Sequence, residues 1–248
     1  MFNCRIYMAG FTAAMPTVSL LLKQRGFPLE NEASQRITHL LLPVPTFDEK
    51  GSIRGGGDLA SILDQLPTDI TVMGGNLSHP LLKNYQTKDF LQDPHFVAEN
   101  ANITAHCTLR MILHLLPCTL ERCPVLVIGW GRIGKCLTKL LKAVGAKVVV
   151  AARKPQDRAM LKALGYDAID TKGLDPCGFR VIINTVPEPI LQDCDADSLK
   201  IDLASKAGIT GPDVIWARGL PGKDAPESTG RLIADTITGM LMGQEVCL

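Results

Sequence analysis

Apolar and polar residues alternate along this chain in blocks that predict strands and helices in turn. The clearest pattern covers residues 125–153. It begins with an unbroken apolar run, 125–128, which is typical of a buried strand. Apolar residues then recur at helical spacing from Ile133 to Val144, and a second apolar run covers residues 147–152. This segment is therefore predicted to fold as strand, tight turn, helix and strand.

Glycines occupy positions 129, 131 and 134 of the predicted turn, in G-x-G-x-x-G spacing. In a dinucleotide-binding fold the first permits the turn, the second lets the backbone approach a pyrophosphate, and the third lets helix and strand pack closely. The helix N-terminus adds unpaired N–H groups and the positive end of a dipole. We interpret the turn as a nucleotide site rather than a purely structural turn, because its full context is present. The candidate cofactor-binding residues are Gly129, Trp130, Gly131, Arg132, Ile133 and Gly134.

The end of the second predicted strand bears on which dinucleotide is bound. An NAD site usually has Asp or Glu there, to accept a hydrogen bond from the ribose 2′-OH. This chain has Arg153 and Lys154 instead, and the first acid that follows is Asp157. Two cations suit a 2′-phosphate, although a solvated basic turn before Pro155 would have the same sequence. We expect NADP, with NAD as second choice.

The same alternation continues on both sides of this unit. Before it, strands are expected at residues 4–8, 37–42 and 69–73, and helices at 12–25 and 58–66. After it, strands are expected at 166–169, 180–184, 198–203 and 214–217, and helices at 155–164 and 228–242. The predicted fold class is α/β with two domains, a doubly wound Rossmann domain preceded by a smaller parallel α/β domain. The boundaries are 1–102 for the small, substrate domain, 103–117 for a bridging helix and 118–248 for the dinucleotide domain with its C-terminal helix.

Composition narrows the class of protein. The 248 residues are 46% hydrophobic and 21% charged, with a net charge of +1, so neither nucleic acid nor an anionic membrane is expected as a partner. Neither a membrane-spanning run nor a signal peptide is expected from the sequence. Eight cysteines without C-x-x-C spacing fit reduced thiols in a cytoplasmic protein. The five histidines show no zinc-binding spacing, so we expect no metal.

A cofactor domain in second place resembles the D-2-hydroxyacid dehydrogenase architecture. Those enzymes use a His–acid pair and an Arg, and their histidine lies late in the cofactor domain. This chain has no histidine after His114. A relative of those enzymes that uses different chemistry therefore remains a weaker alternative.

Several motifs are similar to those of the dipicolinate synthase A-subunit family of sporulation enzymes. The resemblance spans most of the chain, and its late motifs are more specific than the glycine fingerprint. The matching segments are Leu42-Pro43-Val44 with the glycine-rich loop after it, 127–134, Ala152-Arg153, 183–187, 201–205, 219–223, Ala225-Pro226 and Thr229-Gly230. The resemblance implies an NAD(P)-dependent oxidoreductase that oxidises a dihydrodipicolinate-type precursor to pyridine-2,6-dicarboxylate. It also implies a flavoprotein-like B-subunit as partner, and we expect a homodimer.

The predicted crevice outside the strand carboxyl ends contains further candidates. Asn184, Thr185, Val186 and Pro187 are assigned to the cofactor, although polar residues also end strands for structural reasons. Asp202 and Ser205 are assigned to catalysis or orientation, or else they cap the loop after their strand.

The remaining candidate residues concern the substrate. Lys223 lies in a loop rich in Gly and Pro and is the best candidate for a cation that binds a dicarboxylate. His106 follows Thr104-Ala105, where the family has a glutamate before the bridging helix, and is either a general base or a core histidine. A nucleotide-binding regulatory or scaffold subunit without chemistry of its own is the main alternative to an enzyme.

Overall fold

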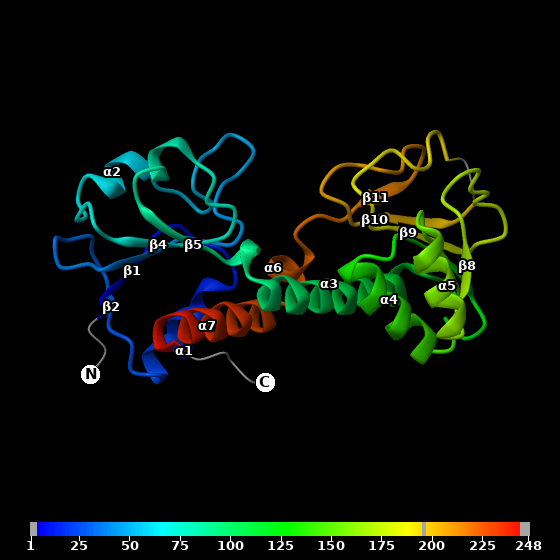
Figure 1. Cartoon of the computed structure of the whole chain (residues 1–248), viewed down its shortest axis with the longest axis horizontal. Helices are drawn as coiled ribbons and strands as arrows, with labels where there is room; N and C mark the ends of the chain where they lie inside the picture. Colours follow the sequence, from blue (N-terminus) through cyan, green and yellow to red (C-terminus); the bar gives the residue numbers. More distant parts are fainter. Residues whose placement is uncertain (1–3, 195–196, 244–248) are drawn as a thin grey trace. The chain divides into compact units, whose positions relative to one another are not determined.

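The computed structural model describes residues 4–194 and 197–243 (Figure 1). The chain divides into two compact units, one formed by residues 1–100 and 221–248 and the other by residues 101–220. Each unit is built around one parallel sheet. The α/β fold class with two parallel sheets is therefore confirmed.

The sheet of the first unit has five parallel strands in the order β2-β1-β3-β4-β5. The three strands at its centre are the ones that the apolar runs predict, and β4 is buried along its whole length. The outer strands β2 and β5 were not predicted, because one is very short and the other, Gln-Thr-Lys-Asp, is polar. The strands are β1 (Ile6–Met8), β2 (Leu29–Glu30), β3 (His39–Leu41), β4 (Thr71–Gly74) and β5 (Gln86–Asp89).

Helices and 3-10 turns lie between these strands and after the last of them. Asp58 begins one of them as predicted, since its side chain accepts a hydrogen bond from the Ser61 N–H at 2.9 Å. The bridging helix is longer than expected, because it begins at Pro94 and not near residue 103. The Asp93 side chain caps this start, since it accepts a hydrogen bond from the Phe96 N–H at 2.9 Å. These helices are α1 (Met15–Gln24), α2 (Leu59–Leu63), the 3-10 turns η1 (Pro80–Leu82) and η2 (Phe90–Gln92), and α3 (Pro94–Leu115), which continues into the second unit.

The last helix departs from the expected domain organisation. We expected it in the dinucleotide domain, but α7 (Pro226–Met242) lies beside α1 in the first unit (Figure 1). Gly230 permits this close packing, because a Cβ there would come within 2.7 Å of the Ala14 carbonyl oxygen. Arg25 adds a hydrogen bond to Thr238 at 2.8 Å and an ion pair with Asp235. The segment before α7, expected to be a loop, contains the short helix α6 (Leu220–Asp224).

The second unit holds a six-stranded parallel sheet in the order β11-β10-β9-β6-β7-β8. Numbered within the unit, this is the doubly wound order 3-2-1-4-5-6, and it reverses between β6 and β9. Ligands of such sheets bind beyond the strand carboxyl ends at this reversal. The strands are β6 (Pro124–Ile128), β7 (Lys147–Ala151), β8 (Asp167–Ile169), β9 (Val181–Asn184), β10 (Leu199–Asp202) and β11 (Val214–Trp216).

Among the described residues, helices connect only the first three strands of this sheet to one another, one from β6 to β7 and one from β7 to β8. They are α4 (Arg132–Ala143) and α5 (Pro155–Ala163). Later strands are joined by loops, which supply apolar side chains to the core: Leu191 and Ile209 pack with Leu126, Ile128 and Ile182. A pairing of Leu191 with Ile209 ties two of these loops together. These loops therefore supply part of the core beside the second half of the sheet.

Candidate functional site

The glycine turn joins β6 to α4 and lies at the point where the strand order reverses. Gly129 has φ of +105°, which favours glycine, and its N–H donates to the Ala151 carbonyl oxygen at 2.9 Å. A Cβ at Gly129 would lie 2.4 Å from Thr185 Oγ1, and one at Gly134 would lie 2.2 Å from the Gly129 carbonyl oxygen. These two glycines are therefore required by the packing of the turn itself.

Gly131 has different surroundings. Its φ of −81° suits any residue, and a Cβ there would meet no heavy atom within 4 Å. It is the N-cap residue of α4, and the Lys135 N–H is already bonded to its carbonyl oxygen at 2.9 Å. The first N–H groups of a helix have no partner within the helix, and no acidic residue occupies the first turn of α4. The turn thus presents open space and helix N–H groups together, which suits a phosphate.

A cavity of about 290 Å³ opens beside this turn. The sequence-predicted residues that it brings together are Gly129, Trp130, Gly131, Arg153, Lys154, Val186 and Pro187. Five further residues line it that were not predicted as site residues: Ala152, Asp157, Thr171, Glu188 and Ile190. Thr171 and Glu188 follow the ends of β8 and β9, so the rule of strand carboxyl ends could have found both.

The rim of the cavity carries charges of both signs. Arg153 Nη1 lies 3.5 Å from Glu188 Oε2, and both side chains are more than half exposed, at 70% and 61%. Such an exposed pair is weak, typically about 0–1 kcal/mol, so Arg153 can exchange this partner for a ligand at little cost. Lys154 and Asp157 also line the cavity.

Arg158 fixes the backbone from which Arg153 projects. Its Nη1 donates to the carbonyl oxygens of Ala152 and Arg153 at 2.7 and 2.8 Å, and its Nη2 pairs with Asp170 at 2.9 Å. A hydrogen bond from the Lys172 backbone, together with the Arg158 guanidinium, lowers the pKa of Asp170. Asp170 therefore stays ionised at neutral pH and holds Arg158. No local sequence signal indicates this role, because Arg158 and Asp170 meet only in the folded chain.

Trp130, between the first two glycines, packs outside the turn. Its ring centroid lies 6.1 Å from that of Tyr166 at an interplanar angle of 57°, and Lys135 Nζ lies 5.8 Å from the Trp130 ring. The residue also lines the cavity and is half-buried. These contacts fix the indole beside the turn.

The side chains of Asn184 and Thr185 bond to the backbone next to the cavity. Asn184 is fully buried, and its side chain bonds to the backbone N–H and carbonyl oxygen of Val186 at 3.0 and 2.9 Å and to Asp202 at 3.0 Å. Thr185 Oγ1 donates to the Ile128 carbonyl oxygen at 2.9 Å. Neither lines the cavity. Their contacts match the structural alternative, in which polar residues end a strand and fix the turn that follows it.

Asp202 is also fully buried. Oδ1 accepts hydrogen bonds from Asn184 Nδ2 and from the Ala204 N–H, and Oδ2 accepts from the N–H groups of Gly208 and Ile209 at 2.7 and 2.9 Å. The carboxylate thus caps the loop after β10, and it faces the protein rather than solvent. This geometry corrects the assignment of Asp202 to catalysis, since the group is a positioning residue of the fold.

The other candidates lie outside this cavity. Arg132 is exposed and Ile133 half-buried in the first turn of α4. Ser205 is exposed in the loop after β10, His106 is exposed on α3, and Lys223 is exposed in the last turn of α6. The exposure of His106 corrects the interpretation of this residue as a core histidine.

Neither a metal-binding cluster nor a membrane span is found in residues 4–194 and 197–243. No group of three or more His, Cys, Asp or Glu side chains in that part of the chain could hold a metal ion. None of its helices is long and apolar enough to cross a membrane. None of its seven cysteines forms a disulfide, and Cys247 lies outside the described residues.

Comparisons with known proteins support the resemblance that the motifs indicate. No protein-family model matches the sequence. The dipicolinate synthase A-subunit of Bacillus subtilis is 25% identical over 239 residues, which cover 84% of this chain and 78% of the relative. The crystal structure of the dipicolinate synthase A-subunit from Bacillus halodurans superposes with a TM-score of 0.86 at 21% identity, covering 97% of this chain and 98% of that one. The resemblance to the dipicolinate synthase A-subunit is confirmed.

More distant structures share the fold. Transhydrogenase from Sinorhizobium meliloti has a TM-score of 0.68 at 10% identity, covering 96% of this chain and 93% of its own. D-Lactate dehydrogenase from Escherichia coli has a TM-score of 0.58 at 14% identity, covering 97% of this chain and 98% of its own. This chain therefore shares its fold with a transhydrogenase and a D-lactate dehydrogenase.

Proposed function

We propose that this protein is an NADP-dependent oxidoreductase subunit of the dipicolinate synthase type. The resemblance to the dipicolinate synthase A-subunit and the dehydrogenase-like fold support an oxidoreductase. On this proposal the substrate is a dihydrodipicolinate-type dicarboxylate and the product is pyridine-2,6-dicarboxylate. The partners are a flavoprotein-like B-subunit and a second copy of the chain, in the cytoplasm.

The observation that carries the proposal is the contrast among the three glycines. Gly129 and Gly134 are required by internal packing, whereas Gly131 has open space where a side chain would be. A turn built only for structure would need no glycine at position 131, since its φ is −81°. A pyrophosphate at the α4 N-terminus supplies the reason for it, because the ligand needs close approach to the backbone.

The residues around the cavity fit a dinucleotide. The α4 N-terminus would hold the pyrophosphate, and Arg153 and Lys154 would hold a 2′-phosphate at the end of β7. Arg158 keeps the backbone of Arg153 in place, and Val186 and Pro187 provide an apolar wall. The bound nicotinamide would accept a hydride from the substrate ring. Cations, with Lys223 the first candidate, would bind the substrate carboxylates.

Calorimetric titration with NADP(H) and NAD(H) tests the cofactor assignment. We expect NADP(H) to bind more tightly to the wild type. Arg153→Ala should weaken NADP(H) by roughly 1.5–3 kcal/mol, the value of a hydrogen bond to a charged group, and leave NAD(H) nearly unchanged. Glu188→Gln is the matched control, because it removes the partner of Arg153 and should not weaken NADP(H). Equal affinity for both cofactors, or tighter binding of NAD(H), would contradict the assignment.

A second candidate is a nucleotide-binding regulatory or scaffold subunit without chemistry of its own. It is favoured by Asp202, whose four hydrogen bonds all go to the protein. Hydride transfer from an enzymatically prepared dihydrodipicolinate-type substrate, measured with and without the flavoprotein-like partner, separates the two. An enzyme reduces NADP in one of these assays, whereas a regulatory subunit binds the nucleotide and reduces none.

A further inference from the structure

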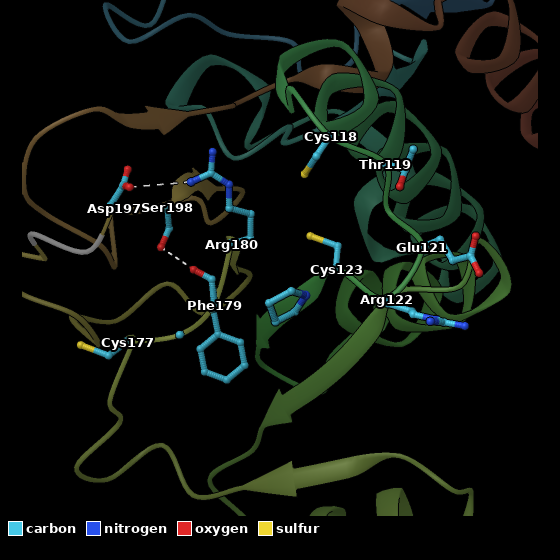
Figure 2. Close-up of a pocket in the computed structure, with 12 residues that line it drawn as sticks. Cys118, Thr119, Glu121, Arg122, Cys123, Cys177, Phe179, Arg180, Asp197 and Ser198 are labelled. Carbon is cyan, nitrogen blue, oxygen red and sulfur yellow. Dashed lines mark hydrogen bonds and ion pairs between the residues drawn. The ribbon is translucent and has the colours of Figure 1, made fainter.

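The second unit contains another cavity, of about 600 Å³, at the amino-terminal ends of β6, β9 and β10 (Figure 2). It is lined by Pro124, which begins β6, and by Arg180 and Ser198, which precede β9 and β10. The glycine turn follows the opposite end of β6. This second cavity is therefore separate from the candidate cofactor site, and its chemistry does not depend on the proposed function.

The thiols of Cys118 and Cys123 point toward one another in this cavity (Figure 2). Burial raises the pKa of the Cys123 thiol, and the adjacent Cys118 raises that pKa further. Cys118 is exposed, whereas Cys123 is only 6% exposed. One thiol is therefore open to solution, and the other is buried beside it.

The loop between α3 and β6 explains how residues five positions apart face each other. The Cys123 N–H donates to the Leu120 carbonyl oxygen at 3.0 Å, and Arg122 has φ of +58°. This turn folds the chain back on itself, so that Cys118 and Cys123 lie across it. A disulfide needs its sulfur atoms about 2.05 Å apart, and the exposed position of Cys118 leaves its side chain room to move toward Cys123.

We propose that Cys118 and Cys123 form a redox-modification site, at which a hydroperoxide converts the facing thiols to an intramolecular disulfide. The Cys118 thiolate attacks the peroxide oxygen, which breaks the O–O bond and gives a sulfenic acid and an alcohol, or water from hydrogen peroxide. The Cys123 thiolate then attacks the Cys118 sulfur, so that the S–S bond forms and the oxygen leaves as water. The two thiols lose two electrons and two protons, and the hydroperoxide is reduced.

Arg180 favours the second step. Its side chain lines the same cavity, where its guanidinium pairs with Asp197 at 3.8 Å (Figure 2), and its charge counteracts part of the rise in the pKa of Cys123. A cation beside a thiol stabilises the thiolate, which is the attacking form. Cys177 lines the cavity too, but its thiol points away from Cys118 and Cys123 (Figure 2). The geometry thus singles out one pair among three cysteines.

The full-length reduced protein, treated with stoichiometric hydrogen peroxide and digested under non-reducing conditions, provides the test. Peptide mass spectrometry should find a Cys118–Cys123 link that lacks two hydrogen atoms and is reversed by dithiothreitol. Cys177→Ser, the matched control, should form the same link to the same extent. Failure to form it in the folded wild type, or an equal yield of links to Cys177, would overturn the proposal.

Two variants test the order of the steps. Cys123→Ser should leave Cys118 as a sulfenic acid that dimedone traps. Cys118→Ser changes an exposed position that cannot disturb the core, and it should abolish the rapid consumption of peroxide by this pair. Arg180→Met should slow closure of the disulfide severalfold while the sulfenic acid forms at the same rate. A Cys118→Ser protein that consumes peroxide as fast as the wild type would contradict the assignment of Cys118 as the first nucleophile.

Discussion

The three glycines of the turn belong to one sequence motif but have different surroundings in the folded chain. Gly129 has a positive φ, and a Cβ there would lie 2.4 Å from its nearest neighbour, whereas the space beside Gly131 is empty. The effect of a side chain on stability should therefore differ between the two positions, and so should its effect on binding.

Gly131→Val should abolish dinucleotide binding while the protein keeps its melting temperature, because the new side chain fills only the space assigned to the pyrophosphate. Calorimetric titration and thermal unfolding measure the two effects. Gly129→Val is the matched control and should lower the melting temperature, since it combines a strained φ with a clash against Thr185. A folded Gly131→Val protein that binds cofactor like the wild type would show that the site is misplaced.

At the scale of elements, a glycine allows α7 to pack closely against α1. Gly230 lies where α7 meets α1, and a Cβ there would lie 2.6 Å from Thr17 Cβ and 2.7 Å from the Ala14 carbonyl oxygen. The helix therefore stabilises the five-stranded unit, to which the start of the chain also belongs.

Gly230→Val should destabilise the protein by about 1–3 kcal/mol, the usual cost of forcing extra carbon atoms into a packed interface. Urea unfolding measures the change. Gly222→Val in the short helix α6 serves as control, since no heavy atom lies within 4 Å of a Cβ at that position. Equal stability of the two variants would contradict the observed packing of α7 on α1.

Strand β3 gives the first unit a dependence on pH. Burial, and secondarily the charge of Lys88, lower the pKa of His39 below its ordinary value of 6.5. The unfolded chain then binds more protons than the folded chain as pH falls through 6.5, so stability decreases with falling pH until it levels off below the folded-state pKa. His39→Gln should lose this part of the pH dependence in urea unfolding between about pH 7.5 and 5. His95→Gln, at an exposed position, should keep the slope of the wild type; the same slope in His39→Gln would refute the assignment.

At the scale of the whole molecule, the chain passes from one unit to the other twice, at residues 100–101 and 220–221. Lys223 follows the second crossing closely and is exposed in the last turn of α6. An exposed cation makes little difference to stability, so substitution there can report on substrate binding alone.

Lys223→Met should leave cofactor affinity and melting temperature nearly unchanged and weaken substrate binding or turnover by roughly 1.5–3 kcal/mol, as expected for one lost charged contact. Steady-state kinetics with the dicarboxylate substrate measure the loss. Lys206→Met, which replaces an exposed lysine in the loop after β10, is the comparison. Unchanged turnover in Lys223→Met would remove this residue from the proposed substrate site.

Local pattern alone determined much of this protein. The apolar runs predicted the central strands of both sheets, because a parallel strand buried on both faces needs continuous apolar sequence. The glycine spacing located the turn at the strand reversal, and the residues after β7 located Arg153 and Lys154 at the same cavity. These features depend on residues that are neighbours in the chain, so their spacing carries the information.

Only the tertiary structure decided which distant residues meet. It paired α7 with α1, joined Asn184 to buried Asp202, placed Glu188 against Arg153 and turned Cys118 toward Cys123. Polar residues such as Asn and Asp have the same local signature whether they bind a ligand or cap a loop. Their roles depend on burial and on the donors that surround them, which the fold supplies and periodicity does not encode.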